Sequence, residues 1–290
     1  QFNENIDMRR EPAGWRRPGF DDSAWHAPLV GRQDHRFVEA VTPPLQHWRA
    51  DPTVLKEKAP GRYFIDFGAE VVGHTRIRVK GPAGHVMTVW HGEELLSPGD
   101  KGYAPRTVRH AMRCNCDYQD RVTLSGGDDL IEFYDYRGFR YVELIGAPAK
   151  PEVWVDVRHH RFDEGASSFD SSSETLNGIW KISKRGVRMG CQGVFVDCPT
   201  REKGQYTGDS YMTAVSQLLL TADPTLTRAA LLNYHFSQRF DKGMLCVAPG
   251  GFRQELAEWS LLWPLMLEHY YRMTGDRRLV VKMIDAGALE

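Results

Sequence analysis

The sequence predicts a multidomain protein in which a β-sandwich is followed by a ring of helices. The chain has 290 residues, and a length above about 250 favours more than one domain. Residues 62–160 contain short alternating apolar and polar runs broken by Gly and Pro, which is the pattern of a sandwich. After residue 169 the apolar residues recur at helical spacing. Helices that follow one another without strands favour a helical toroid over an α/β sheet.

The first 50 residues are rich in Pro, Arg and Trp. The stretch from Trp15 to Trp25 resembles a loop of galactose-binding-like jelly rolls. We therefore expect residues 1–50 to be the end of a jelly-roll or carbohydrate-binding-like module. Its tryptophans could stack on sugar rings. The alternative, which we favour, is that Trp15 and Trp25 only hold a small sandwich together.

Residues 51–160 are expected to form the β-sandwich domain. Turn residues separate the alternating runs at close spacing, which is typical of short antiparallel strands. We assign no catalysis to this region, and we interpret its arginines as cross-strand partners of Asp and Glu. The expected strands are Tyr63–Phe67, Thr75–Val79, Val86–Trp90, Arg121–Leu124 and Tyr141–Ile145.

Residues 161–290 are expected to be helical. Ser172 or Ser173 followed by Glu174 is typical of a helix N-terminus, and this first helix is expected to run to Cys191. The later helices are expected at Ser210–Leu220, Leu226–Phe240, Trp259–Met273 and from Arg278 onward.

The apolar spacing also predicts which faces of these helices are packed. In the helix that starts near Trp259, Pro264 is tolerated only if it lies in the first turn or two. The expected faces are Leu176, Ile179, Trp180 and Val187 in the first helix, Tyr211, Met212, Val215, Leu218 and Leu219 in the second, and Leu261, Leu262, Leu265, Leu267 and Tyr271 in the fourth.

One segment points to chemistry, and it reads Asp197-Cys-Pro-Thr-Arg-Glu-Lys-Gly-Gln-Tyr-Thr-Gly-Asp209. Its carboxylates, Asp197, Glu202 and Asp209, lie on a loop that Pro199 stiffens and that glycines allow to turn tightly. Carboxylates that converge on one ligand suit hydrolysis of a glycosidic bond. One acid protonates the leaving oxygen, and others hold hydroxyls or activate water. The structural alternative is that Asp209 caps the next helix and that Arg201 and Lys203 pair with Asp197 or Glu202 in an ordinary solvated cluster.

This segment resembles the signature loop of the bacterial α-L-rhamnosidases of glycoside hydrolase family 78, whose catalytic domain is an (α/α)6 barrel. The resemblance covers residues 197–202 and 206–209. It implies that Glu202 is the general acid and that Asp197 and Asp209 bind sugar hydroxyls. Arg201 is expected to orient a carboxylate.

Two positions depart from the family pattern. The usual Leu-Gly-Trp is replaced by Gly204-Gln205-Tyr206, so Tyr206 is expected to line the sugar site with a smaller ring and an added hydroxyl. Some members of the family place the acid one residue later, where this chain has Lys203. Because a lysine cannot be that acid, we assign the role to Glu202.

A second resemblance begins at Trp259 and ends in Tyr-Tyr-Arg-Met-Thr-Gly-Asp276. It is similar to the family's barrel helix that starts at an acidic-aromatic pair. The pair here is Glu258-Trp259, where relatives more often carry aspartate before the tryptophan. The resemblance implies that Trp259 contacts the sugar and that Glu258 binds a hydroxyl.

Taken as a whole, the resemblance implies a β-sandwich followed by the N-terminal part of an (α/α)6 barrel, which would occupy residues 161–290. Five helices are too few to close that barrel, and the family's catalytic base, a glutamate, is expected beyond residue 290. The implied activity is inverting hydrolysis that removes terminal α-L-rhamnose from glycosides or polysaccharides. The alternatives are another (α/α)6-barrel glycosidase, a polysaccharide lyase, or an incomplete, inactive fragment that only binds carbohydrate.

Composition limits the classes of partner that are expected for this chain. The net charge is −1, the isoelectric point is near 6.9, and Lys and Arg are scattered, so neither nucleic acid nor an anionic membrane surface is expected as a partner. A rhamnose-containing carbohydrate fits better. The sequence lacks a run of 18 apolar residues, so we expect no membrane span. Localisation stays open between the cytoplasm and a secreted or periplasmic location in a bacterium, and a homodimer is left open.

The five cysteines do not form a dense disulfide framework in a chain of this length. Cys114 and Cys116 lack a second pair of ligands at fitting spacing, and so does the His159-His160 pair. We therefore expect no metal and no cofactor. Cys198 has no obvious histidine base beside it, and we interpret it as a packing residue rather than a nucleophile.

Overall fold

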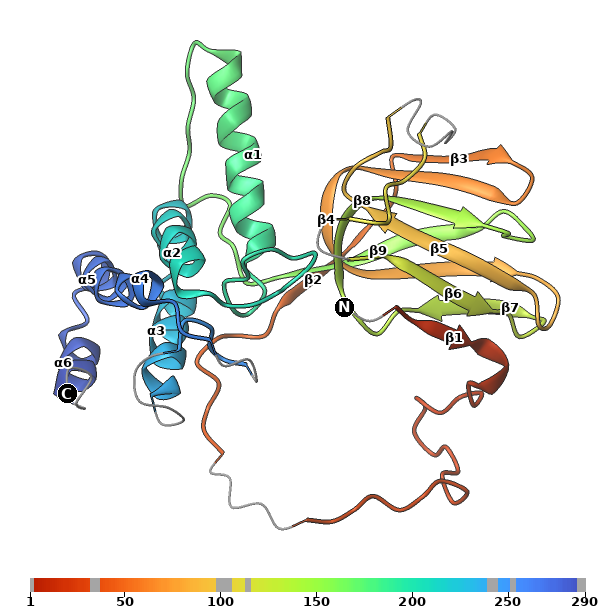
Figure 1. Ribbon diagram of the computed structural model, residues 1–290, viewed down its shortest axis with the longest axis horizontal. Helices are drawn as coiled ribbons and strands as arrows, with labels where there is room; N and C mark the ends of the chain where they lie inside the picture. The colour runs from red at the N-terminus through yellow and green to blue at the C-terminus, as the bar shows by residue number, and fades with distance from the viewer. Residues whose placement is uncertain are drawn as a thin grey trace.

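The computed structural model describes residues 3–31, 37–97, 106–112, 116–238, 245–250 and 254–285. A sheet-rich domain is followed along the chain by a helical domain, and the two lie side by side in Figure 1. The predicted order of a β-rich part and then a helical part is confirmed at this level.

The described strands form one sheet in the order β1-β6-β5-β8-β4-β9-β2, with β3 and β7 also pairing with β4. The β1–β6 pairing is parallel, and the other pairings are antiparallel. Both β1 and β2 belong to the first 50 residues, so the two ends of that segment join the sheet built by the following hundred. The strands are β1 (Asn5–Asp7), β2 (Gln46–Ala50), β3 (Val54–Ala59), β4 (Arg62–Lys80), β5 (Val86–Gly92), β6 (Gln119–Thr123), β7 (Asp128–Glu132), β8 (Arg137–Ile145) and β9 (Glu152–His159), with a 3-10 turn η1 (Met8–Arg10) after β1.

Strand β4 connects the two parts of the sheet. The sequence predicted separate strands at Tyr63–Phe67 and Thr75–Val79, but both belong to one strand of 19 residues. The register with β8 shifts between Asp66 and Val71, and Gly68 lies there with φ +79°, a conformation that glycine adopts at little cost. The chain therefore bends through a bulge without leaving the sheet. Its first half pairs with β3, its second half pairs with β9 and β7, and β8 pairs on both sides of the bulge.

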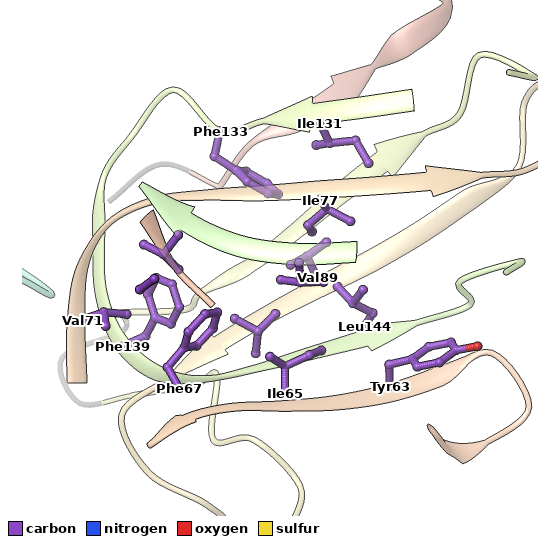
Figure 2. Close-up of a cluster of buried hydrophobic side chains, with 14 of the residues drawn as sticks. Tyr63, Ile65, Phe67, Val71, Ile77, Val89, Ile131, Phe133, Phe139 and Leu144 are labelled. Carbon is purple, nitrogen blue, oxygen red and sulfur yellow. The ribbon is translucent and has the colours of Figure 1, made fainter. Parts of the chain in front are cut away.

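The sheet folds over on itself, and the hydrophobic core of this domain lies between the parts of the sheet that face each other (Figure 2). Alternation along each strand turns one set of side chains inward, and Ile65, Ile77, Val89 and Leu144 are completely buried. Figure 2 shows these side chains pointing toward one another from β4, β5 and β8. The predicted alternation thus identified real core positions.

The helical domain contains α1 to α6 in the described residues. Ser173 caps α1 by accepting a hydrogen bond from the Leu176 backbone N–H, which confirms one of the two predicted caps. Pro264 is the third residue of α5, inside its first turn, as the sequence required. Of the predicted third helix, Phe240 lies outside the described residues. The helices are α1 (Glu174–Gly190), α2 (Thr207–Thr221), α3 (Thr225–Ser237), α4 (Ala257–Ser260), α5 (Leu262–Thr274) and α6 (Arg277–Asp285).

The predicted packing faces were partly wrong. In α5 the buried residues are Trp263, Met266, Leu267 and Tyr270, so of the predicted face only Leu267 is buried. In α2 the buried member of the predicted face is Leu218, and in α1 the buried residue is Met189 rather than any predicted one. Apolar residues occur on more than one side of these helices, and periodicity then cannot select the packed side. The residues predicted to pack that are exposed are Leu176, Ile179, Met212, Leu219, Leu261, Leu265 and Tyr271.

A buried ion pair between β6 and β8 is connected through Tyr118 to the loop that follows α1. Arg137 on β8 donates from Nη2 to Oδ1 of Asp120 on β6 at 2.8 Å, and its Nη1 lies 2.7 Å from Oδ2 of the same carboxylate. The Asp120 carboxylate also accepts from the Glu4 backbone N–H at 2.8 Å. The Arg137 guanidinium lies 4.7 Å from the ring centre of Tyr118, and the Tyr118 hydroxyl donates to the backbone carbonyl of Thr200. These contacts connect the ion pair to Thr200, which belongs to the segment 197–209 that carries the predicted catalytic carboxylates.

Candidate active site

The loop between α1 and α2 is closed by Asp197. Its backbone N–H donates to the Gly204 carbonyl at 2.9 Å, and its Oδ1 accepts from the Gly204 N–H at 2.9 Å. Its Oδ2 accepts from the Cys198 thiol at 3.1 Å. Two hydrogen bonds therefore join Asp197 to Gly204, and residues 198–203 between them form a closed loop.

Glu202 is exposed at the tip of this loop, and both of its carboxylate oxygens have protein partners. The Tyr206 hydroxyl donates to Oε2 at 2.5 Å, and the Arg201 guanidinium pairs with Oε1. The two contacts fix the direction of the carboxyl group. A carboxyl that is oriented and open to solvent can exchange a proton with a ligand in front of it.

Asp209 lies in the first turn of α2, the helix that follows the loop. The capping position is occupied by Tyr206, whose side chain makes no capping bond, so the structure contradicts the alternative in which Asp209 caps the helix. Burial raises the pKa of Asp209, and the nearby charge of Asp197 raises it further. The two aspartates are therefore close enough for the charge of Asp197 to affect the protonation of Asp209.

Trp259 on α4 packs directly on the start of α2. A Cβ added to Gly208 would lie 2.4 Å from Cε3 of the Trp259 ring, so only a glycine fits at this position. The Tyr206 and Trp259 rings meet edge to face, with centroids 5.9 Å apart and an interplanar angle of 68°. This arrangement supplies two aromatic surfaces beside the Glu202 carboxyl.

The structure therefore brings together six of the seven predicted residues: Asp197, Arg201, Glu202, Tyr206, Asp209 and Trp259. The pKa of the Tyr206 hydroxyl is raised by burial and by the charges of Asp197 and Asp209, while Arg201 lowers it, so these charges act on the hydroxyl that holds Glu202. Glu258 is exposed on α4, and within the described residues it makes no hydrogen bond to the other six.

The loop is anchored to the sheet domain by Lys203, which pairs with Asp135 rather than with Asp197 or Glu202, the partners that the sequence offered for it. Its backbone has φ +55°, and its Nζ donates to Asp135 Oδ2 at 2.7 Å and to the Tyr136 carbonyl at 2.6 Å. Burial lowers the pKa of Lys203, although Asp135 opposes this shift. Pro199 adds a second contact, since a Cβ on Gly138 would lie 3.0 Å from its Cγ.

We expect Lys203→Met to lower kcat about tenfold, which corresponds to ~1.4 kcal/mol of transition-state stabilisation. The loop would lose its anchor to the sheet, and Glu202, one residue away, would lose its fixed direction. Steady-state kinetics on an α-L-rhamnoside would measure the effect. Lys184→Met is the matched control, because Lys184 also donates to a backbone carbonyl, that of Glu164 at 2.7 Å, but on α1 away from the loop. Equal kinetics for both variants would contradict the anchoring role.

A cavity of about 350 Å³ lies between the sheet domain and the loop. Of the predicted site residues, Arg201 is the one that lines it. The lining residues are Glu93, Glu94, Arg109, Met112, Cys116, Cys198, Thr200 and Arg201.

Glu70, on β4 at the junction of the two domains, has a pKa raised to about 7 by burial and by the charge of Glu93, while Arg185 opposes the shift. The folded protein therefore keeps a proton that the unfolded chain releases at lower pH. Stability due to this proton is present at acidic pH and is lost as the pH rises through about 7.

We expect Glu70→Gln to flatten the fall in melting temperature between about pH 5 and pH 8, because the amide has no proton to lose. Thermal unfolding at both pH values would measure this. Glu152→Gln, at the exposed end of β9, is expected to keep the wild-type pH dependence. A Glu70→Gln variant with that same dependence would argue against the assignment.

The other groups considered from the sequence have structural roles. Burial and the hydrogen bond to Asp197 raise the pKa of Cys198, which favours the unreactive thiol. The Nδ1 of His159 forms a hydrogen bond of 2.7 Å with the backbone carbonyl oxygen of His160. The Nε2 of His160 lies 3.7 Å from Oδ2 of Asp223. Cys114 lies outside the described residues. Among those described, no group of three His, Cys, Asp or Glu side chains could hold a metal ion, and no helix there is long and apolar enough to cross a membrane.

Two family profiles match this chain. The bacterial α-L-rhamnosidase concanavalin-like domain matches residues 56–160, and the bacterial α-L-rhamnosidase six-hairpin glycosidase domain matches residues 164–285. The chain belongs to the bacterial α-L-rhamnosidase family. The loop that carries Glu202 lies inside the second match.

Individual relatives agree with this assignment. An α-L-rhamnosidase of Streptomyces avermitilis is 29% identical over 293 residues, which cover 98% of this chain and 28% of the relative. A crystal structure of the Streptomyces avermitilis α-L-rhamnosidase complexed with L-rhamnose is similar with a TM-score of 0.80 at 28% identity, covering 97% of this chain and 28% of that one. The α-L-rhamnosidase from Dictyoglumus thermophilum has a TM-score of 0.82 at 23% identity, covering 96% of this chain and 32% of that one, and supports the fold. The chain thus spans less than a third of the length of these relatives.

Proposed function

We propose that this chain forms part of an inverting α-L-rhamnosidase in which Glu202 is the general acid. The observation that carries the proposal is the environment of its carboxyl group: the Tyr206 hydroxyl and Arg201 hold it, on a loop that Asp197 closes. A relative whose structure is described as complexed with L-rhamnose supports rhamnose as the sugar.

In this mechanism Glu202 protonates the departing glycosidic oxygen, so the leaving group departs as a neutral alcohol. Asp197 and Asp209 accept hydrogen bonds from the sugar hydroxyls. Trp259 and Tyr206 cover the apolar face of the ring. Inversion further requires a base carboxylate about 6.5–9.5 Å from the acid that activates water on the opposite face. We expect this base outside residues 1–290.

The architecture that goes with this function is a β-sandwich over residues 51–160 followed by the first hairpins of an (α/α)6 barrel over residues 161–290, with residues 1–50 as the end of a jelly-roll-like module. Two observations support this architecture. Both halves of β4 contribute side chains to one hydrophobic core, and in the described residues α1 to α6 follow one another without intervening strands. Glu258 is retained as a candidate hydroxyl ligand because it adjoins Trp259, whose ring meets that of Tyr206.

The full-length protein should release rhamnose from an aryl α-L-rhamnoside. Proton NMR during the first minutes should detect the β-anomer first, because inversion of an α-linkage yields it directly. Release of the α-anomer first would refute inversion, and absence of hydrolysis of every α-L-rhamnoside offered would refute the activity.

A further inference from the structure

Two residues that line the cavity between the two domains contact carboxylates of the predicted site. Arg201 lines the cavity and pairs with Glu202. Cys198 also lines it and donates to Asp197 at 3.1 Å. A group attached to the oxygen that Glu202 protonates therefore lies within reach of this cavity, and the leaving group is such a group.

The wall opposite the loop is built from the sheet domain and is held rigidly. Glu93 and Glu94 directly follow β5. The Arg109 N–H donates to the Glu94 carbonyl at 3.0 Å, and its guanidinium donates to Glu94 Oε2 at 2.9 Å. Met112 is held by the carbonyl of Cys116 at 2.7 Å. A preformed wall lowers the entropic cost of binding a ligand.

Among the described residues that line the cavity, the charges favour a neutral ligand with hydroxyl groups. Arg109 is already paired with Glu94, and Arg201 is paired with Glu202, so neither guanidinium is left to attract an anion. Glu93 and Glu94 would repel a uronate or a phosphate, but their oxygens can accept hydrogen bonds from hydroxyls. The volume of about 350 Å³ is within the usual range of small-molecule sites.

We propose that this cavity is the subsite for the leaving group, and that it binds the neutral sugar or other polyhydroxylated group from which rhamnose is released. The subsite rests on the proposed function. It assigns to the sheet domain a direct part in substrate selection through Glu93 and Glu94, while the helical domain supplies the acid and the rhamnose site.

The test compares two substrates on the full-length protein. In a neutral rhamnosyl disaccharide the second sugar fills the cavity, whereas in α-L-rhamnosyl fluoride the leaving group is a single atom. Glu93→Gln and Glu94→Gln should each lower the ratio of kcat/KM for the disaccharide to kcat/KM for the fluoride by about tenfold, because a hydrogen bond to a charged acceptor is weakened. Glu152→Gln is the control for Glu94→Gln, since Glu152 pairs with Arg49 at the same 2.9 Å on the outer surface of the sheet domain.

The outcomes separate the two proposals. If the wild type cleaves both substrates and the ratio is unchanged in both variants, the subsite is wrong and the proposed function stands. If both substrates slow equally, the glutamates have only a structural role and the subsite is again wrong. If the wild type cleaves neither substrate, the proposed function fails and the subsite fails with it.

Discussion

Glu202→Gln should lower kcat for a rhamnosyl disaccharide by about 10²–10⁴-fold, the usual contribution of a general acid. The amide has the shape of the carboxyl, and its single oxygen can still accept from Arg201 while its NH2 group donates to the Tyr206 hydroxyl oxygen, so the loop should keep its conformation. What is lost is the proton for the departing oxygen. The loss should shrink for leaving groups that depart without protonation, and kcat measured with the disaccharide and with α-L-rhamnosyl fluoride would reveal this difference.

The control is Glu268→Gln. Glu268 also pairs with an arginine, Arg272, at 2.7 Å, but on the exposed side of α5, so its replacement should not change kcat for either substrate. If Glu202→Gln slowed the fluoride as strongly as the disaccharide, Glu202 would act in binding or folding rather than as the acid. If it slowed neither, the acid would have to be another residue.

The candidate site could be predicted from the sequence because most of its members are close in the chain. Asp197, Glu202, Tyr206 and Asp209 lie on one loop and the helix turn that follows it, and local hydrogen bonds set their arrangement. The resemblance identified Trp259 as a site residue, but its packing on the same turn, which depends on the missing side chain of Gly208, became apparent only from the structure.

The parts that sequence reasoning missed depend on distant contacts. The partner of Lys203 is Asp135, 68 residues earlier, and no local pattern indicates such a pair. Glu93 and Glu94 become candidates only because the sheet domain lies against the loop. Similarly, alternation identified the two halves of β4 but could not indicate that a bulge joins them.

Asp120→Ala should reduce the free energy of unfolding by about 3–5 kcal/mol, because it leaves a buried guanidinium without its counter-charge. Asp120 is 0% exposed and Arg137 is 2% exposed, so water cannot replace the lost partner without disrupting the core. Chemical denaturation monitored by tryptophan fluorescence would measure the change. A second effect is expected at the site, since Arg137 lies against Tyr118, whose hydroxyl holds the Thr200 carbonyl. We therefore expect kcat to fall as well.

Two further variants separate the buried charge from other causes. Asp128→Ala removes a carboxylate that pairs with Arg78 at the exposed edge of the same sheet, at 3.2 Å, and should cost at most about 1 kcal/mol. The double variant Asp120→Leu with Arg137→Met removes both buried charges and should recover much of the lost stability, because an apolar pair of similar volume avoids the desolvation of two ions. If Asp120→Ala cost no more than Asp128→Ala, the ion pair would not stabilise the sheet domain. If the double variant recovered stability but not kcat, the contact from Arg137 through Tyr118 to Thr200 would be the part of the network that positions the loop for catalysis.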